Sequence, residues 1–215
     1  MVSTAGVVSA HCCPTPPPPP ADSGYRKVLW TALLVNAGMF LIEISASALS
    51  GSASLAADAV DFAGDAGNYA LSIAALAAGG LWASRLALGK GLAMAAYGIG
   101  VVAFAGWRVW LGGPPEPITM GVVGTMALAA NLGVAWLLYA YRDGDANMRA
   151  VWLCTRNDAI SNLAVLAAAA GVVGTSSAWP DIMVALLMAG LAINSAAQVV
   201  AHARVELRQR SEVAA

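Results

Sequence analysis

The chain has 215 residues, of which 59% are hydrophobic and only 11% charged, with a net charge of −1. Soluble domains carry about 25% charged residues. The low charge and a mean hydropathy of +0.70 therefore exclude an ordinary soluble domain and predict an integral membrane protein, with the lipid bilayer and no nucleic acid as its partner. The first 24 residues lack the apolar core of a cleavable signal peptide.

Residues 1–25 predict a disordered cytoplasmic tail, because a His-Cys-Cys sequence is followed by a run of prolines. Two interpretations of this tail stay open. His11, Cys12 and Cys13 could hold a soft metal ion weakly, or the two thiols are incidental, since their spacing is not that of a closed zinc site.

Residues 26–204 predict an all-α transmembrane domain of six helices, because six apolar segments of about 20 or more residues follow one another. Short connectors rich in Gly, Ser and Pro separate the segments. Residues 205–215 are expected to form a short cytoplasmic tail, with no folded domain after the last span. The expected spans are 28–49, 55–80, 92–111, 118–141, 148–173 and 180–202.

The basic residues predict the orientation of the bundle. With six spans, every connector on one side contains Lys or Arg, and the three connectors on the other side contain none. Because basic residues stay in the cytoplasm, both termini are expected there. The residues on the cytoplasmic side are Arg26, Lys27, Arg85, Lys90, Arg142, Arg149, Arg204, Arg208 and Arg210.

Three carboxylates interrupt the apolar span at 55–80, namely Asp58, Asp61 and Asp65. Residues three, four and seven apart share one face of a helix. Each ionisable group within a bilayer costs about 3 kcal/mol unless something compensates its charge. The stretch therefore predicts a site for a divalent cation or for protons.

The span at 148–173 carries Cys154 and Asp158, again four residues apart. This helix runs antiparallel to the span at 55–80. If the two polar faces meet, Asp61, Asp65, Cys154 and Asp158 converge near the bilayer midplane. Three carboxylates and a thiolate suit tetrahedral zinc, and the thiolate favours zinc or cadmium over magnesium or calcium. Iron, cobalt and manganese stay open.

Proton exchange is expected from the charge of these four groups. Four ionised ligands without a metal would be untenable in an apolar interior, so most of them must hold protons when the site is empty. A divalent ion displaces those protons when it binds. The structural alternative, in which the acids pair with Arg156, leaves most of the charge uncompensated.

Other polar residues lie within the expected spans. They are candidates to support the metal site or a pathway to it, and they are Asp58, Glu43, Asn36, Asn162 and Asp181. For the amides, the simpler role is hydrogen bonding between helices. The short likeness of 65–68 to 158–162, on oppositely running helices, indicates an inverted repeat of three plus three spans.

The sequence resembles the cation diffusion facilitator family of metal–proton exchangers over about residues 27–203. The most specific part is the run from Ser52 to Asp65, with its small residues, Ala-Asp-Ala and a pair of carboxylates four apart. The resemblance also covers Asn36 and Glu43 in the first span, Asp158 in the fifth, and the Pro-Asp start of the sixth.

The chain departs from the family pattern at Cys154, where the family has His or Asp, and this favours softer ions. No cytoplasmic metal-binding domain follows the sixth span, so the resemblance is to a short variant. Family members are homodimers, which implies a homodimer here. The expected location is a bacterial inner membrane.

The predicted function is secondary transport rather than catalysis: export of Zn²⁺, or alternatively Cd²⁺, from the cytoplasm in exchange for protons. The metal is the substrate, and no cofactor is expected. The alternative is an intramembrane metal-dependent transferase that uses an aspartate cluster to hold Mg²⁺ and a phosphorylated substrate. No basic residue in the span at 55–80 would meet such a phosphate.

Overall fold

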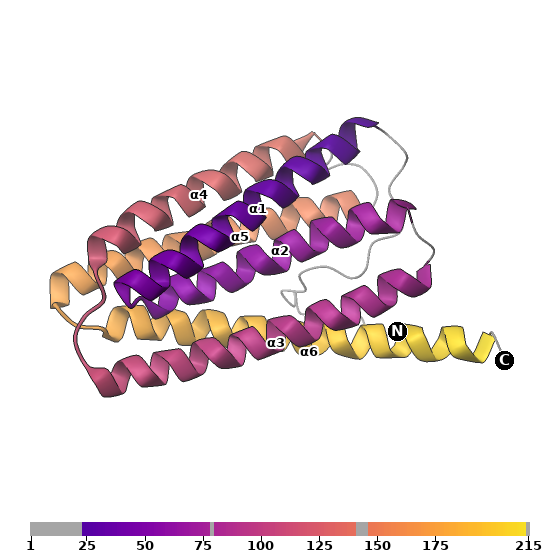
Figure 1. The fold of residues 1–215 in the computed structure, drawn as a ribbon. Coiled ribbons are helices and arrows are strands. Elements are labelled where there is room, and N and C mark those ends of the chain that lie inside the picture. The colour runs from indigo at the N-terminus through magenta and orange to yellow at the C-terminus, as the bar shows by residue number, and fades with distance from the viewer. Residues whose placement is uncertain (1–22, 78–79, 141–145, 214–215) are drawn as a thin grey trace, which may run out of the picture.

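The computed structural model describes residues 23–77, 80–140 and 146–213, and for some of these, Cys154 included, only the helical backbone. The described residues form six long helices and no β-strand, which confirms the predicted all-α fold (Figure 1). The helices are α1 (Ser23–Ser50), α2 (Ala53–Ala77), α3 (Gly80–Leu111), α4 (Pro117–Tyr139), α5 (Ala146–Thr175) and α6 (Trp179–Val213).

Five of the helices contain a described segment long and apolar enough to cross a membrane. The five segments lie in α1, α3, α4, α5 and α6. α2 is the exception, because three carboxylates interrupt its apolar sequence. Many large apolar side chains are exposed on the surface of the bundle, among them Leu34, Leu49, Trp110 and Trp136. The chain is therefore a helical, multi-pass membrane protein.

Three connections lie at one end of the bundle, which we call the capped end: 51–52, 112–116 and 176–178 (Figure 1). At the first, Gly51 takes a left-handed φ of 72°, and its N–H donates to the Ser47 carbonyl at 2.8 Å. Glycine adopts this conformation without the steric cost that a Cβ brings. At the second, Glu116 caps α4 and Pro117 begins it, as proline favours a first helical turn.

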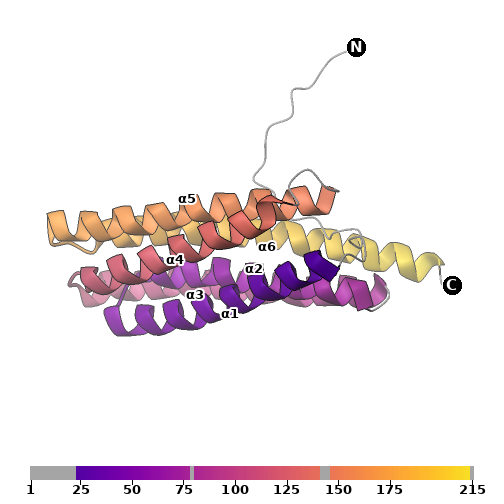
Figure 2. The ribbon, with the colours of Figure 1, turned by 90° about the horizontal axis from the view of Figure 1, so that it is seen from above.

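α2 lies centrally in the bundle, in contact with α1, α3, α5 and α6. α3 and α6 run side by side along much of their length (Figures 1 and 2). Their close approach requires glycine: a Cβ on Gly98 would lie 2.7 Å from Cγ1 of Ile193, and one on Gly91 would lie 2.8 Å from Cγ2 of Val200. Small residues of this kind let helices pack in lipid.

Apolar side chains fill the bundle in three clusters. The largest joins all six helices, and includes Leu55, Val60 and Met120. A small cluster joins Met39, Phe62 and Ala127 of α1, α2 and α4. The third joins the same three helices farther from the capped end, around Leu29, Tyr69 and Leu138. The polar residues of α1 and α2 thus lie among, or between, apolar layers.

Four helices, α1, α3, α5 and α6, are longer than the spans expected from the sequence. α3 begins at Gly80 rather than at residue 92, and α6 continues to Val213, through most of the expected tail at 205–215. α1 likewise begins at Ser23. The apolar pattern marks the segment that suits hydrocarbon, whereas helical hydrogen bonding continues into the flanking polar residues.

Candidate functional site

The carboxylates of α2 form a row along the interior of the bundle. Asp58 is buried, with 1% of its surface exposed, while Asp61 and Asp65 are half-buried. At a rise of 1.5 Å per residue, the row extends about 10 Å along the helix axis. Because α2 is surrounded by four other helices, these acids lie where neighbouring helices can supply further ligands.

Asp65 of α2 meets Asp158 of α5, since the two carboxyl groups lie within hydrogen-bonding reach of each other. The structure thus brings together one predicted ligand from each of the two helices. Asn162, one turn farther along α5, is completely buried, and neither its Oδ1 nor its Nδ2 has a hydrogen-bond partner within the described part of the chain.

The other predicted ligands are only partly described. Asp61 is close enough for its charge to act on Glu43 of α1. The Cys154 side chain lies outside the described residues, as do His11, Cys12 and Cys13 of the tail. Among the side chains that are described, no three His, Cys, Asp or Glu residues gather in the manner of a metal site.

Glu43 and Asp58 form a second pair of carboxyl groups, between α1 and α2. They are 0% and 1% exposed, and their carboxyls interact. No hydrogen bond of ordinary geometry satisfies either Glu43 oxygen or the Asp58 Oδ2 within the described residues. Two ionised carboxylates this close in an apolar interior repel each other strongly, so the pair is suited to hold a shared proton.

Two buried asparagines lie between the apolar clusters of α1 and α4. Asn36 is 0% exposed, and its Nδ2 donates to the Ala32 carbonyl at 2.8 Å. Asn131 is 2% exposed. The Oδ1 atoms of both have no hydrogen-bond partner in the described part of the bundle. The Oδ1 of Asn36 therefore makes no hydrogen bond to another helix within the described residues, although such a bond is the simplest role expected for Asn36.

Asp181 of α6 caps the first turn of α2. Its Oδ1 accepts from the Ser52 hydroxyl at 2.7 Å and from the Ser54 N–H at 3.0 Å, and its Oδ2 accepts from the Ala53 N–H at 2.8 Å. Free N–H groups at a helix N-terminus attract a carboxylate in this way. Asp181 was expected to support the metal site or a pathway, and these contacts give it a structural place at the capped end.

Glu116 provides a second acidic cap at the same end. Its oxygens accept from the backbone N–H groups of Thr119 at 2.6 Å and Ile118 at 2.9 Å. A side-chain hydrogen bond with Thr119, followed by these two backbone bonds, lowers the pKa of Glu116 below its usual range. Its own N–H donates to the Ser50 carbonyl at 3.0 Å, which joins the start of α4 to the end of α1.

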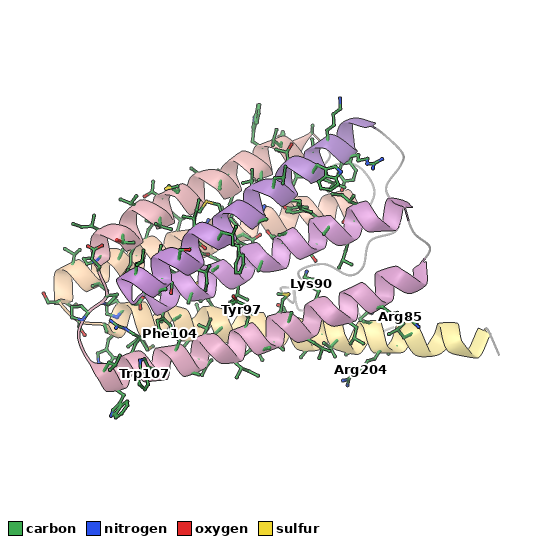
Figure 3. The ribbon with its side chains drawn as sticks, viewed as in Figure 1. Arg85, Lys90, Tyr97, Phe104, Trp107 and Arg204 are labelled. Carbon is green, nitrogen blue, oxygen red and sulfur yellow. The ribbon has the colours of Figure 1, made fainter. Side chains whose placement is uncertain are left out.

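The position of Lys90 of α3 differs from the one that the sequence predicts, which is among the charges of the cytoplasmic surface. Its side chain turns from α3 toward α2 and its Nζ donates to Oδ1 of Asn68 (Figure 3). Its positive charge also acts on the Asp65 carboxyl. One signal was present: Lys90 is the sole charged residue between Arg85 and Arg108.

The interior of the bundle therefore holds two carboxyl pairs, Asp65 with Asp158 and Glu43 with Asp58, and one lysine beside the first pair. Oxygen donors in such a setting bind a divalent cation or exchange protons. In comparisons with known proteins, no family model and no curated protein matches this chain.

Proposed function

We propose that the protein is a secondary transporter that exports a divalent transition-metal ion, Zn²⁺ or Cd²⁺, from the cytoplasm in exchange for protons. The observation that carries this proposal is the meeting of Asp65 and Asp158 inside the bundle. Carboxylates on two different helices can close on an ion in one conformation and release it in another, which a site on one helix cannot do.

The proposed ligands are Asp61, Asp65, Cys154 and Asp158. Cys154 is one helical turn from Asp158 along α5, as Asp61 is one turn from Asp65 along α2. This spacing supports including the two remaining donors with the pair that already meets. A thiolate among carboxylates selects a borderline or soft ion over Mg²⁺ or Ca²⁺.

Protons are exchanged in this proposal because metal and protons compete for the same oxygens. Glu43 and Asp58, nearer the capped end, extend the row of acids and serve as the proton pathway. Their oxygens without partners support this role, because a carboxyl that passes protons must change its bonding during each cycle. Asn36 and Asn162 line the same interior.

The proposed topology has six spans, with α2 as the sixth membrane-crossing helix and both termini in the cytoplasm. The distribution of Lys and Arg supports this orientation, in which the capped end lies outside. The proposed family is the cation diffusion facilitators, and we expect a homodimer in a bacterial inner membrane. The quoted residues of α1, α2, α5 and α6 support that assignment.

An intramembrane Mg²⁺-dependent transferase is the second candidate, and one observation favours it. Lys90 supplies a basic group beside Asp65, which the sequence of α2 alone lacks. A phosphorylated substrate would need both a metal ion at the acids and a cation for its phosphate.

Flux measurements in proteoliposomes distinguish these functions. A Zn²⁺ gradient should drive proton movement through the wild-type protein, recorded with a pH-sensitive dye inside the vesicle. Asp65→Asn and Asp158→Asn should each abolish this flux, because each removes a ligand and a proton-carrying group. Glu116→Gln is the matched control, since this exposed acid lies outside the bundle interior.

A normal rate of exchange in either interior variant would contradict the proposed site. Absence of metal-driven proton flux in the wild type, together with Mg²⁺-dependent turnover of a phosphorylated lipid precursor, would favour the transferase.

A further inference from the structure

Lys90 extends into the bundle instead of toward the membrane surface. It lies ten residues into α3, about 15 Å along the helix axis from Gly80. Its side-chain carbons pack on α2 at Gly67, where an added Cβ would lie 3.2 Å from the Lys90 Cδ. The small residue therefore makes room for the lysine stem to cross from α3 to α2.

The ammonium group of Lys90 binds the Asn68 side chain, which lies three residues after Asp65 on α2. Residues three apart lie on the same face of a helix, about one turn from each other. Asp65 in turn meets Asp158 of α5. Contacts of three helices thus place a fixed positive charge next to the carboxyl pair.

The position of this charge matters because an ion-free carboxyl pair in an apolar interior needs compensation. A lysine carries its ammonium group on a flexible four-carbon stem, so it can move a few ångströms without unfolding a helix. Asn68 gives the ammonium a neutral oxygen acceptor on the helix that carries Asp65.

We propose that Lys90 is a tethered counter-ion of the Asp65–Asp158 pair, which an arriving divalent cation must displace. This inference rests on the proposed metal transport. It makes Lys90 a specificity-determining residue, since a doubly charged ion can outcompete the single ammonium charge at two carboxylates whereas Na⁺ or K⁺ gains too little. It also lowers affinity, so that the ion can leave.

Direct metal binding tests the inference. Zn²⁺ and Cd²⁺ binding to the full chain in lipid nanodiscs would be measured by titration calorimetry at one fixed pH. Lys90→Met should bind both ions about tenfold more tightly than the wild type, because the competing charge is gone. It should also exchange them more slowly in proteoliposomes. Lys90→Arg, which keeps the charge, should stay within about threefold of the wild-type affinity.

Arg85→Gln is the matched control. It removes a basic residue of the same helix, but Arg85 is exposed and lies more than one turn from Lys90 (Figure 3). Its metal affinity should equal that of the wild type. Asn68→Ala removes the oxygen that accepts from the Lys90 ammonium. The ammonium should then bind the carboxylates more strongly, so metal binding should weaken.

Each outcome decides the question. Tighter binding with slower exchange in Lys90→Met supports the counter-ion role. If Lys90 were only structural, its removal would lower both the metal affinity and the rate of exchange. Unchanged or weaker binding in Lys90→Met overturns it, and if Asp65→Asn still abolishes binding, metal transport itself stands. A wild-type protein that neither binds nor moves metal overturns both proposals.

Discussion

Two groups of buried polar residues around α2 differ in how completely they are hydrogen-bonded. At the capped end, Ser52, Ser54 and Asp181 satisfy one another, and the Ser47 hydroxyl donates to the Ser52 carbonyl at 2.7 Å. Only a few residues farther along α2, Asp58 and its neighbour Glu43 of α1 have oxygens without partners in the described part of the chain. Both groups are similarly buried, so burial alone does not separate them.

The difference indicates what each group is for. Buried polar groups that serve only stability are almost always fully hydrogen-bonded, because an unsatisfied one costs about 1–3 kcal/mol. Oxygens left without partners reduce stability and are retained where a ligand or proton uses them. The comparison therefore assigns a structural role to the capped end and supports the exchange proposed for the interior.

The largest effect that would test this comparison concerns the interior pair. Glu43→Gln or Asp58→Asn should reduce metal-driven proton flux by about tenfold or more, since an amide carries no exchangeable carboxyl proton at neutral pH. Thermal stability should stay equal or rise, because a buried ionisable group is replaced by a neutral one. Proteoliposome flux and thermal unfolding in detergent measure the two effects. A variant that loses stability while retaining flux would reverse the assignment.

Asp181→Ala should produce the opposite result. It leaves the Ser52 hydroxyl and two backbone N–H groups of α2 without an acceptor, so the free energy of unfolding should fall by about 3 kcal/mol. Flux per correctly folded molecule should change little. Asp181→Asn retains one acceptor oxygen and should lose about half as much stability. Full stability in Asp181→Ala would mean that the cap is dispensable.

A smaller loss of stability is expected at the first connection of the capped end, residues 51–52. In Gly51→Ala, the new Cβ would lie 2.6 Å from the Arg108 guanidinium carbon, at a φ that alanine disfavours. The guanidinium can move, so the cost should come mainly from the backbone, about 1–2 kcal/mol. Gly38→Ala, where nothing lies within 4 Å of the new Cβ, is the control and should not destabilise the helix. Equal melting temperatures for the two variants would contradict this account.

The smallest effect concerns pH at the Glu116 cap. Hydrogen bonds from Thr119 and Ile118 lower the pKa of this carboxyl in the folded protein. Its contribution to stability is therefore present above the ordinary glutamate pKa of about 4.3 and disappears as the pH falls through the lower folded value. The melting temperature should decline in this acidic range, and Glu116→Gln should remove a small part of the decline. An identical pH profile in the variant would show that the cap does not titrate with folding.

Much of the fold could be predicted from the sequence, because hydrophobic length and helical spacing are local properties. The six helices follow from the length of the apolar segments, and the row of Asp58, Asp61 and Asp65 follows from i+3 and i+4 spacing. The approach of Asp158 follows because its helix runs antiparallel to α2. The ends of the helices are less predictable from the sequence, because α3 and α6 continue beyond the apolar residues.

The parts that the sequence did not reveal depend on side-chain direction and long-range contact. Asp181 reaches the start of α2 from 127 to 129 positions away. Lysine is a residue type typical of the surface, and only the packing of α3 on Gly67 of α2 turns the Lys90 side chain inward. A linear pattern contains neither the rotamer nor the distance between helices.

The cap that Asp181 places on α2 also has a consequence for how the protein is made. Membrane helices leave the ribosome in order, and α2 is synthesised long before residue 181 exists. Until α6 arrives, the first N–H groups of α2 lack the acceptor they have in the finished bundle. Truncated products that lack α6 should therefore retain a frayed, protease-sensitive turn at residues 51–54.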